Sequence, residues 1–228
     1  MKNQNGATLI VDLIVLVVVT VIATFAVRSS ILGLKIATNS QVQTLLMENT
    51  NAALFNIENP KTVARHLAQD GMFSYFNSSA NADDELVFCY QGKADSFFSM
   101  TKASAISNGT ITKIGTAGFC KATYFASARS AVLSQVYIKK NKTIGASPLS
   151  HLIQGTSVGQ TPLPVVSNSI SVTVISVLPT FSSATNTQIE ACFKKTSNEV
   201  SACFAENNLP YNTQHADYIV GSQPKLQS

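Results

Sequence analysis

The stretch MKNQNGATLIVDLIVLVVVTVIATFAVRSS (residues 1–30) decides the fold of the N-terminal part of this chain. Six mostly polar or small residues come first, and residues 7–27 then form an apolar run with one charged member, Asp12. As a helix this run would rise about 31 Å, which matches the roughly 30 Å hydrocarbon core of a bilayer. Because lipid offers the backbone no hydrogen-bond partner, the run must be helical there in spite of its many β-branched residues. The sequence therefore predicts a membrane-spanning helix over residues 7–27.

The junction at Gly6 resembles the cleavage signal of type IV pilins and the related pseudopilins. That signal joins a short polar leader to a glycine and then to a small apolar residue followed by Thr, Leu and Ile, as in Gly6 and residues 7–10 here. The resemblance implies that a prepilin peptidase cleaves after Gly6 and methylates the new amino group of Ala7. A cleaved secretory signal would have a shorter apolar region and a small-residue cleavage site; a plain signal anchor is the other alternative.

The single acid of the run departs from the pilin pattern. Most pilins carry glutamate as the fifth residue after the cut, whereas that position is Val11 here and the acid follows as Asp12. One residue turns a helix by about 100°, so the carboxylate of Asp12 lies on a different side of the helix from a glutamate at the fifth position. Pilins without the glutamate are typically minor subunits, and the first 60 residues resemble the PilX class of minor pilins. Asp12 is therefore the candidate assembly carboxylate, which would pair with the N-terminal amine of an adjacent subunit.

The helical pattern continues beyond residue 27 in a more polar form. A mostly apolar stripe recurs every three or four positions: Ile31, Leu34, Thr38, Val42, Leu45, Asn49 and Ala52. Pro60 ends the pattern because its ring removes a donor and disfavours helix at the preceding residue. We expect one helix over residues 8–57, bent at Gly33, with a membrane-spanning half and an amphipathic half.

Strand-like patterns dominate the rest of the chain, after one short helix expected in residues 61–71, with Gly71 as its stop, and a solvated loop at residues 77–84. We expect strands at residues 85–91, 109–115, 133–139 and 169–178 and a last strand around Tyr218. The alternation of Ile170, Val172 and Val174 with Ser and Thr predicts one buried face. The sequence therefore predicts an α+β, pilin-like fold, in which the long helix packs on a mainly antiparallel sheet. Its plan is a leader (1–6), the helix (7–58), a connecting region (59–84) and a β-rich head (85–228).

The four cysteines, Cys89, Cys120, Cys192 and Cys203, indicate an oxidising compartment. They lack C-x-x-C spacing and a nearby histidine, which argues against zinc, and an even number behind a membrane segment favours disulfides. Three connectivities are possible, and we favour the sequential one, Cys89–Cys120 with Cys192–Cys203. Each closure would stabilise the fold by about 3 to 4 kcal/mol. Residues 193–202 resemble the disulfide-bounded surface loop near the C-terminus of many pilins.

No pattern of catalytic, cofactor-binding or metal-binding residues is found. The sequence lacks the serine-hydrolase, zinc-protease, dinucleotide and phosphate-loop motifs, and its histidines are far apart: His66, His151 and His215. The acids Asp83, Asp84 and Glu85 lack the alternating spacing of a calcium loop. The net charge of +4 is scattered apart from Lys139, Lys140 and Lys142, which argues against a nucleic-acid partner. We predict a structural or interaction protein, not an enzyme, with no cofactor and no metal.

The resemblance implies a function and a location for the chain. It implies a minor pilin that helps to prime assembly of a type IV pilus, within a tip-associated complex that serves twitching motility or adhesion. Its partners would be the major pilin, other minor pilins, a tip adhesin, the prepilin peptidase, the inner-membrane assembly platform and membrane lipid. The chain would sit in the bacterial inner membrane with its head in the periplasm, and later in the pilus. Two alternatives are a tip pseudopilin of type II secretion and a signal-anchored periplasmic binding protein or enzyme.

Overall fold

The computed structural model describes residues 5–66, 68, 71–93, 98–107, 110–111, 114–127, 131–141 and 168–220. The chain separates into two compact units, residues 1–42 and residues 43–228. Helix α1 (Asn5–Glu58) runs through both. Residues 43–58 of this helix thus belong to the same unit as the sheet.

Helix α1 is close to the predicted one at both ends. It ends at Glu58, Asn59 is not helical, and Pro60 starts the next helix, α2 (Pro60–His66). Proline suits the first position of a helix, where its missing N–H would have no partner anyway. The helix passes through Gly33 without interruption, and a Cβ there would meet nothing within 4 Å.

The second unit contains a six-stranded antiparallel sheet in the order β3-β2-β1-β4-β5-β6. Its strands are β1 (Glu85–Tyr90), β2 (Ser104–Ser107), β3 (Thr110–Ile111), β4 (Leu133–Lys140), β5 (Asn168–Val177) and β6 (Tyr211–Val220). The predictions for β1, β4 and β5 are right to within a residue at each end. Of the strand expected at 109–115, the structure shows β3 at Thr110–Ile111 and no strand at 114–115, with 109 and 112–113 outside the described residues. Strand β2 was not expected, because its sequence SAIS has weak strand propensity; it forms against β1, where Ala105 pairs with Leu86.

The second unit also contains further helices and turns. They are α3 (Met72–Tyr75), α4 (Asn186–Phe193), α5 (Ser197–Glu206) and the short 3-10 turns η1 (Ser79–Asn81), η2 (Met100–Lys102) and η3 (Pro179–Phe181). The short helix predicted at 61–71 is therefore shorter, since α2 ends at His66, and Gly71 precedes α3 instead of stopping α2. A Cβ on Gly71 would lie 2.5 Å from the carbonyl oxygens of Arg65 and His66, which explains the glycine.

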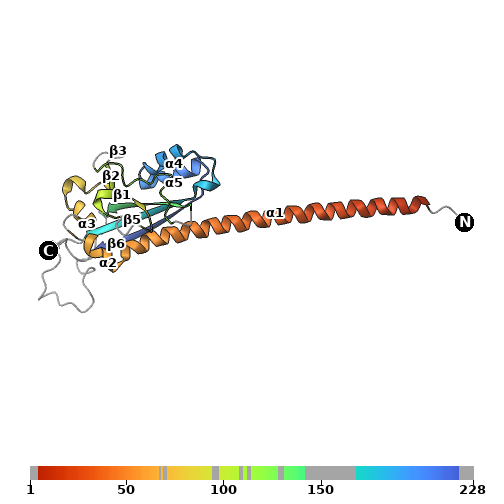
Figure 1. Cartoon of the computed structure of the whole chain (residues 1–228), viewed down its shortest axis with the longest axis horizontal. Coiled ribbons are helices and arrows are strands. Elements are labelled where there is room, and N and C mark those ends of the chain that lie inside the picture. The colour runs from red at the N-terminus through yellow and green to blue at the C-terminus, as the bar shows by residue number, and fades with distance from the viewer. Residues whose placement is uncertain are drawn as a thin grey trace. The chain divides into compact units, whose positions relative to one another are not determined.

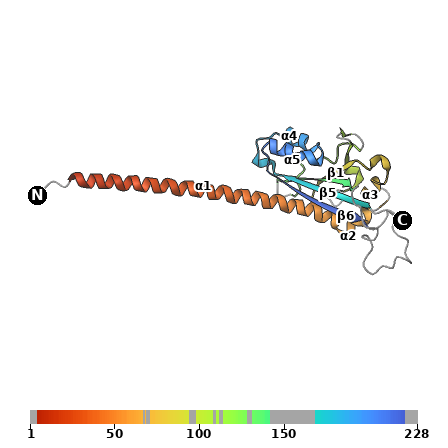
Figure 2. The ribbon, with the colours of Figure 1, turned by 180° about the vertical axis from the view of Figure 1, so that it is seen from behind.

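The sheet of the second unit is covered on both faces, with α1 on one and α4 and α5 on the other (Figures 1 and 2). On the first face, Phe88, Val136 and Val174 share a core with Ala53 and Ile57 of α1. On the second face the core consists of strand, loop and helix residues: Val87, Cys89, Ile106, Phe119, Cys120, Leu133, Tyr137, Ile175, Val177, Ile189, Cys192, Phe193, Val200, Cys203, Phe204 and Leu209. The expectation that β5 buries one face is therefore wrong for its C-terminal half, where both faces are covered.

The buried face of α1 in the second unit differs from the predicted stripe. Leu46, Thr50, Ala53 and Ile57 are buried, at the helical spacing of three or four residues. Of the stripe predicted here, Asn49 is buried and Leu45 is half-buried, but Ala52 is exposed, so the buried face is centred one position further along the helix. A shift of one residue rotates the face by about 100°, and only the shape of the sheet selects between the two faces.

The prediction of a surface loop between Cys192 and Cys203 is wrong. Helix α4 contains Cys192 and α5 contains Cys203, so only residues 194–196 lie between the helices. Helix α4 begins with a capping box between Thr185 and Gln188, a strong start signal. The two helices form because Phe193 and Phe204 pack edge to face, with ring centroids 5.0 Å apart, over the second face of the sheet.

Candidate functional site

The first unit presents apolar side chains on all sides of α1. Every residue from 9 to 37 is exposed, and Leu9, Phe25 and Leu34 are 68%, 68% and 72% exposed. The helix is long and apolar enough to cross a membrane. A soluble protein does not leave so large a continuous apolar surface in water. This segment therefore has the properties of a membrane anchor.

The hydroxyl groups along this segment are satisfied by the helix itself. Thr20 donates to the carbonyl of Val17 over 2.8 Å, and Thr24 donates to that of Val21 over 2.7 Å. Ser30 donates in the same way to Ala26 over 2.9 Å. Lipid offers these hydroxyls no hydrogen-bond partner. Because they already donate to the helix backbone, they can lie in an apolar environment.

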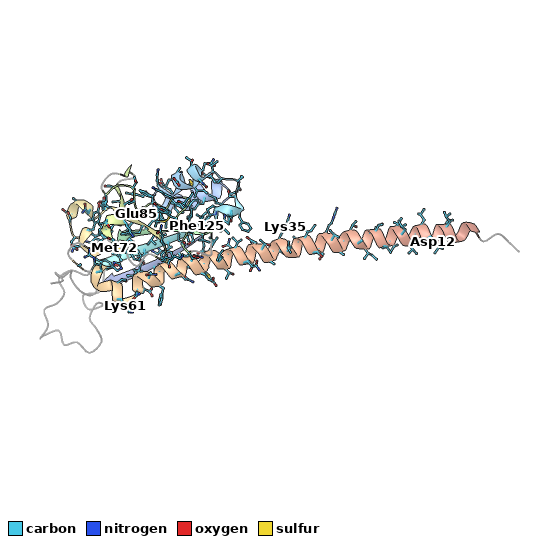
Figure 3. The ribbon with its side chains drawn as sticks, viewed as in Figure 1. Asp12, Lys35, Lys61, Met72, Glu85 and Phe125 are labelled. Carbon is cyan, nitrogen blue, oxygen red and sulfur yellow. A yellow bond between two sulfur atoms is a disulfide. The ribbon has the colours of Figure 1, made fainter. Side chains whose placement is uncertain are left out.

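Asp12 is the one charged residue between residues 7 and 27, and it lies exposed on α1 (Figure 3). No ion pair joins it to any residue that the structure describes. Gly6 and Ala7 occupy the first turn of the helix, where N–H groups lack intrahelical partners and the ends fray. Cleavage after Gly6, methylation of Ala7 and pairing by Asp12 stay predictions.

The cysteines form two disulfides, Cys89–Cys120 and Cys192–Cys203, which is the sequential pairing that the sequence analysis favoured. The first joins β1 to residues 114–127, a segment that we call the disulfide-bound loop. The second joins α4 to α5. Both lie on the second face of the sheet, within its core.

A buried polar network fixes the disulfide-bound loop and α4 to β4. The Cys120 N–H donates to Gln135 Oε1 over 2.8 Å, and Gln135 Nε2 donates to the carbonyl of Phe193 over 2.7 Å. The Tyr137 hydroxyl donates to the same carbonyl over 3.0 Å. Burial, with the charge of Glu85, raises the pKa of Tyr137, so this hydroxyl stays protonated and keeps donating.

Asp84 and Glu85 at the start of β1 are buried, whereas residues 77–80 and Asp83 are exposed, as expected of the solvated loop predicted there. Glu85 is 2% exposed and forms an ion pair with Lys139 over 3.1 Å, and its carboxylate accepts the N–H of Ser197 over 3.1 Å. That N–H belongs to the first turn of α5, where the helix dipole favours a negative charge. Asp84 accepts the hydroxyl of Tyr75 over 2.7 Å. These two carboxylates support packing, and the described residues contain no cluster of three or more His, Cys, Asp or Glu side chains that could hold a metal.

The histidines do not converge on one site. His66 is buried between Phe73 and Phe98, and its burial, with a smaller effect of Arg65, lowers its pKa from 6.5 to about 4. His151 lies outside the described residues, and His215 lies on β6.

The surroundings of His215 contain residue types of a catalytic triad but no enclosed site. Its Nε2 faces both Ser171 Oγ at 3.0 Å and Asp217 Oδ1 at 3.4 Å, whereas its Nδ1 faces Thr173 Oγ1 at 2.9 Å. A triad places the serine and the carboxylate on opposite nitrogens. The side chains of His215 and Asp217 are also 55% and 52% exposed. We derive no catalytic step from this cluster.

The comparisons with known proteins leave the family open. No family model, no curated protein and no solved structure matches this chain. The functional conclusion therefore depends on the chain's own residues and on their geometry.

Proposed function

We propose that this chain is a minor subunit of a type IV pilus that helps to prime assembly of the fibre. Helix α1 holds it in the inner membrane until a prepilin peptidase cleaves after Gly6 and the assembly platform passes it into the fibre. Its head takes part in a tip-associated complex with other minor pilins and an adhesin. The major pilin then adds beneath this complex.

The observation that carries the proposal is the exposed apolar surface of α1 directly after the Gly6–Ala7 junction. Residues 9–37 bury none of their side chains within the chain, so they need lipid or the helices of other subunits. Both environments are apolar, and helix packing in lipid depends on van der Waals contact and on a few polar groups. A single helix can therefore serve first as an anchor and then as a packing surface in a fibre.

The position of Asp12 supports the choice of a minor subunit. A carboxylate in an apolar helix bundle is strongly attracted to a nearby amine, because the local dielectric is low. Asp12 lies one residue after the position at which most pilins carry glutamate. Its carboxylate would therefore approach a neighbour's amine from a different side of the helix. A subunit with such an offset suits the few sites of an initiating complex better than the repeating lattice of the fibre.

The second unit supports an interaction role. Its carboxylates at residues 84 and 85, its buried amide at Gln135 and its cysteines all serve packing. A rigid, disulfide-linked head suits the oxidising periplasm. Contacts with neighbouring subunits then depend on its surface.

Mass spectrometry of sheared pili tests the proposal. We expect N-terminal peptides that begin at a methylated Ala7, in fibres as well as in membranes. Replacing Gly6 by Val should leave an uncleaved chain in the membrane. Gly33→Ala is the matched control, since a Cβ at Gly33 meets no atom within 4 Å, and this variant should be processed normally.

Other results would contradict the proposal. An intact Met1 in membranes only would show a plain signal anchor. Loss of protein secretion with normal pili, after deletion of the chain, would favour a type II secretion pseudopilin.

A further inference from the structure

Two adjoining hollows lie on the second unit beside the disulfide-bound loop. The larger has a volume of about 600 Å³ and includes Lys102, Thr116 and Lys121 in its lining. The smaller has a volume of about 270 Å³ and includes Lys93 and Phe125; Phe125 is marked in Figure 3. Gln91 and Tyr124 line both hollows. The larger one falls in the range of ligand sites, about 300–1,000 Å³.

The charged residues described in the linings of these hollows all carry the same sign. Lys93, Lys102 and Lys121 are exposed, and no ion pair joins any of them to a described residue. Among the residues that the structure describes, neither lining contains Asp or Glu. Glu190, which contacts the disulfide-bound loop, accepts the N–H of Ala122 over 2.9 Å and belongs to neither lining. A ligand that complements the hollows is therefore anionic.

The walls of the hollows are held in place before any ligand arrives. The disulfide Cys89–Cys120 joins the disulfide-bound loop to β1, and the N–H of Gly118 donates to Ser104 Oγ over 2.9 Å. A Cβ on Gly118 would lie 2.1 Å from the carbonyl oxygen of Val87, so the loop sits directly on the strands. Such preorganisation lowers the entropy lost on binding.

The neutral side chains of the linings indicate which kind of anion fits. Gln91, Thr116 and Thr123 offer amide and hydroxyl groups, and Tyr124 and the 45% exposed Phe125 offer aromatic surface. Sugar rings have hydroxyl edges and apolar faces that match this mixture. Since both hollows share Tyr124, successive units of one chain could occupy them in turn.

Other acidic polymers fit the hollows less well. An acidic peptide that adds as a strand needs a free sheet edge, but β1 is paired with β2 on one side and with β4 on the other. Nucleic acid needs a longer basic stripe than three lysines supply.

We propose that the two hollows bind an acidic polysaccharide, whose carboxylates pair with Lys93, Lys102 and Lys121 while a sugar ring lies against Tyr124. Lys121 already lies over that ring, with its Nζ 5.7 Å from the ring centroid, so charge and aromatic surface meet at the centre of the site. This inference does not depend on the pilus proposal, because every residue involved belongs to the second unit.

Calorimetric titration of the full chain in detergent micelles, with disulfides intact, tests the site. The probe is a galacturonate oligosaccharide, and its fully methyl-esterified form is the neutral control. We expect binding of the acid form and at least about tenfold weaker binding of the ester, because charge-assisted hydrogen bonds are lost. The double variant Lys102→Gln and Lys121→Gln should lose about tenfold in affinity, and Tyr124→Leu should also bind more weakly.

The matched control is the double variant Lys194→Gln and Lys195→Gln, which removes two exposed lysines outside both linings. It should bind the acid form as the unmodified chain does. Equal binding of acid and ester, an unchanged affinity in the Lys102 and Lys121 double variant, or tighter binding of single-stranded DNA or polyglutamate would overturn the proposal. Unfolding curves of each variant check that its head is folded.

Discussion

Thr50 of α1 and Ser176 of β5 share a hydrogen bond of 2.8 Å in a place where neither residue has any exposed surface. Ser176 in turn lies 2.7 Å from Ser134 Oγ on β4. A row of hydroxyls therefore crosses from the helix to the sheet within an otherwise apolar interface. Buried polar groups of this kind specify one register, because any sliding leaves them without partners.

Replacing Thr50 by Val should destabilise the second unit by about 1 to 2 kcal/mol, since the shape is kept but Ser176 loses one of its partners. Chemical unfolding of the full chain in detergent measures this. Thr38→Val is the control, because the Thr38 hydroxyl donates to the carbonyl of Leu34 within α1 and to no residue described in the sheet. It should change the free energy of unfolding by less than about 0.5 kcal/mol. Equal effects would mean that the helix-to-sheet bond contributes nothing.

The two disulfides should contribute unequally to stability. Cys89–Cys120 closes a separation of 31 residues and Cys192–Cys203 one of 11, which predicts about 4 and about 3 kcal/mol in the loop-entropy model. Two double Cys→Ala variants, one for each bridge, remove the same atoms and so control for each other. Denaturant midpoints should fall further for the first pair, and the reverse order would contradict the model.

Glu85→Gln should destabilise the chain by about 2 to 3 kcal/mol. The change keeps an oxygen for the N–H of Ser197 but removes the charge that pairs with Lys139, and breaking a buried pair is costly. The value falls below that of a fully buried pair because the Lys139 side chain is 37% exposed. Glu206→Gln, at an exposed position of α5, is the control and should leave the unfolding midpoint unchanged.

His66 should make stability depend on pH between about 6.5 and 4. Its folded pKa, lowered to about 4, lies below the unfolded value of 6.5, so within this window the unfolded chain binds a proton that the folded chain does not. Stability therefore falls as pH falls, by up to about 3 kcal/mol. The free energy of unfolding should depend less on pH in His66→Phe than in the unmodified chain. If the free energy of unfolding of His66→Phe depended on pH as steeply as that of the unmodified chain, this assignment to His66 would be contradicted.

Asp12→Ala should reduce the number of pili and the amount of this chain within them, if the carboxylate pairs with a neighbour's amine during assembly. Electron microscopy counts the pili, and immunoblots of sheared fibres measure incorporation. The control Asp217→Ala removes an exposed acid of β6. Normal piliation and incorporation with Asp12→Ala would leave the carboxylate without an assembly role.

Part of the fold follows from local pattern alone. The β-branched alternation around Val172 and Val174 marked β5, and Pro60 marked the end of α1, because both signals act within a few residues. The helices α4 and α5 were missed although Thr185 and Gln188 form a capping box, because the polar residues between Cys192 and Cys203 resemble a loop. Their apolar positions become evident only when the second face of the sheet is there to cover.

By itself the sequence determined the apolar helix with its single acid and its glycine junction, since length, hydropathy and proline placement act along the chain. Only the tertiary structure decided which face of α1 meets the sheet, why Glu85 is buried, and where the lysine-lined hollows lie. Glu85 and Ser197 are 112 residues apart, and Lys102 and Tyr124 line the same hollow because the disulfide-bound loop is held on the strands. Contacts of that range depend on how distant segments pack, and no local pattern records them.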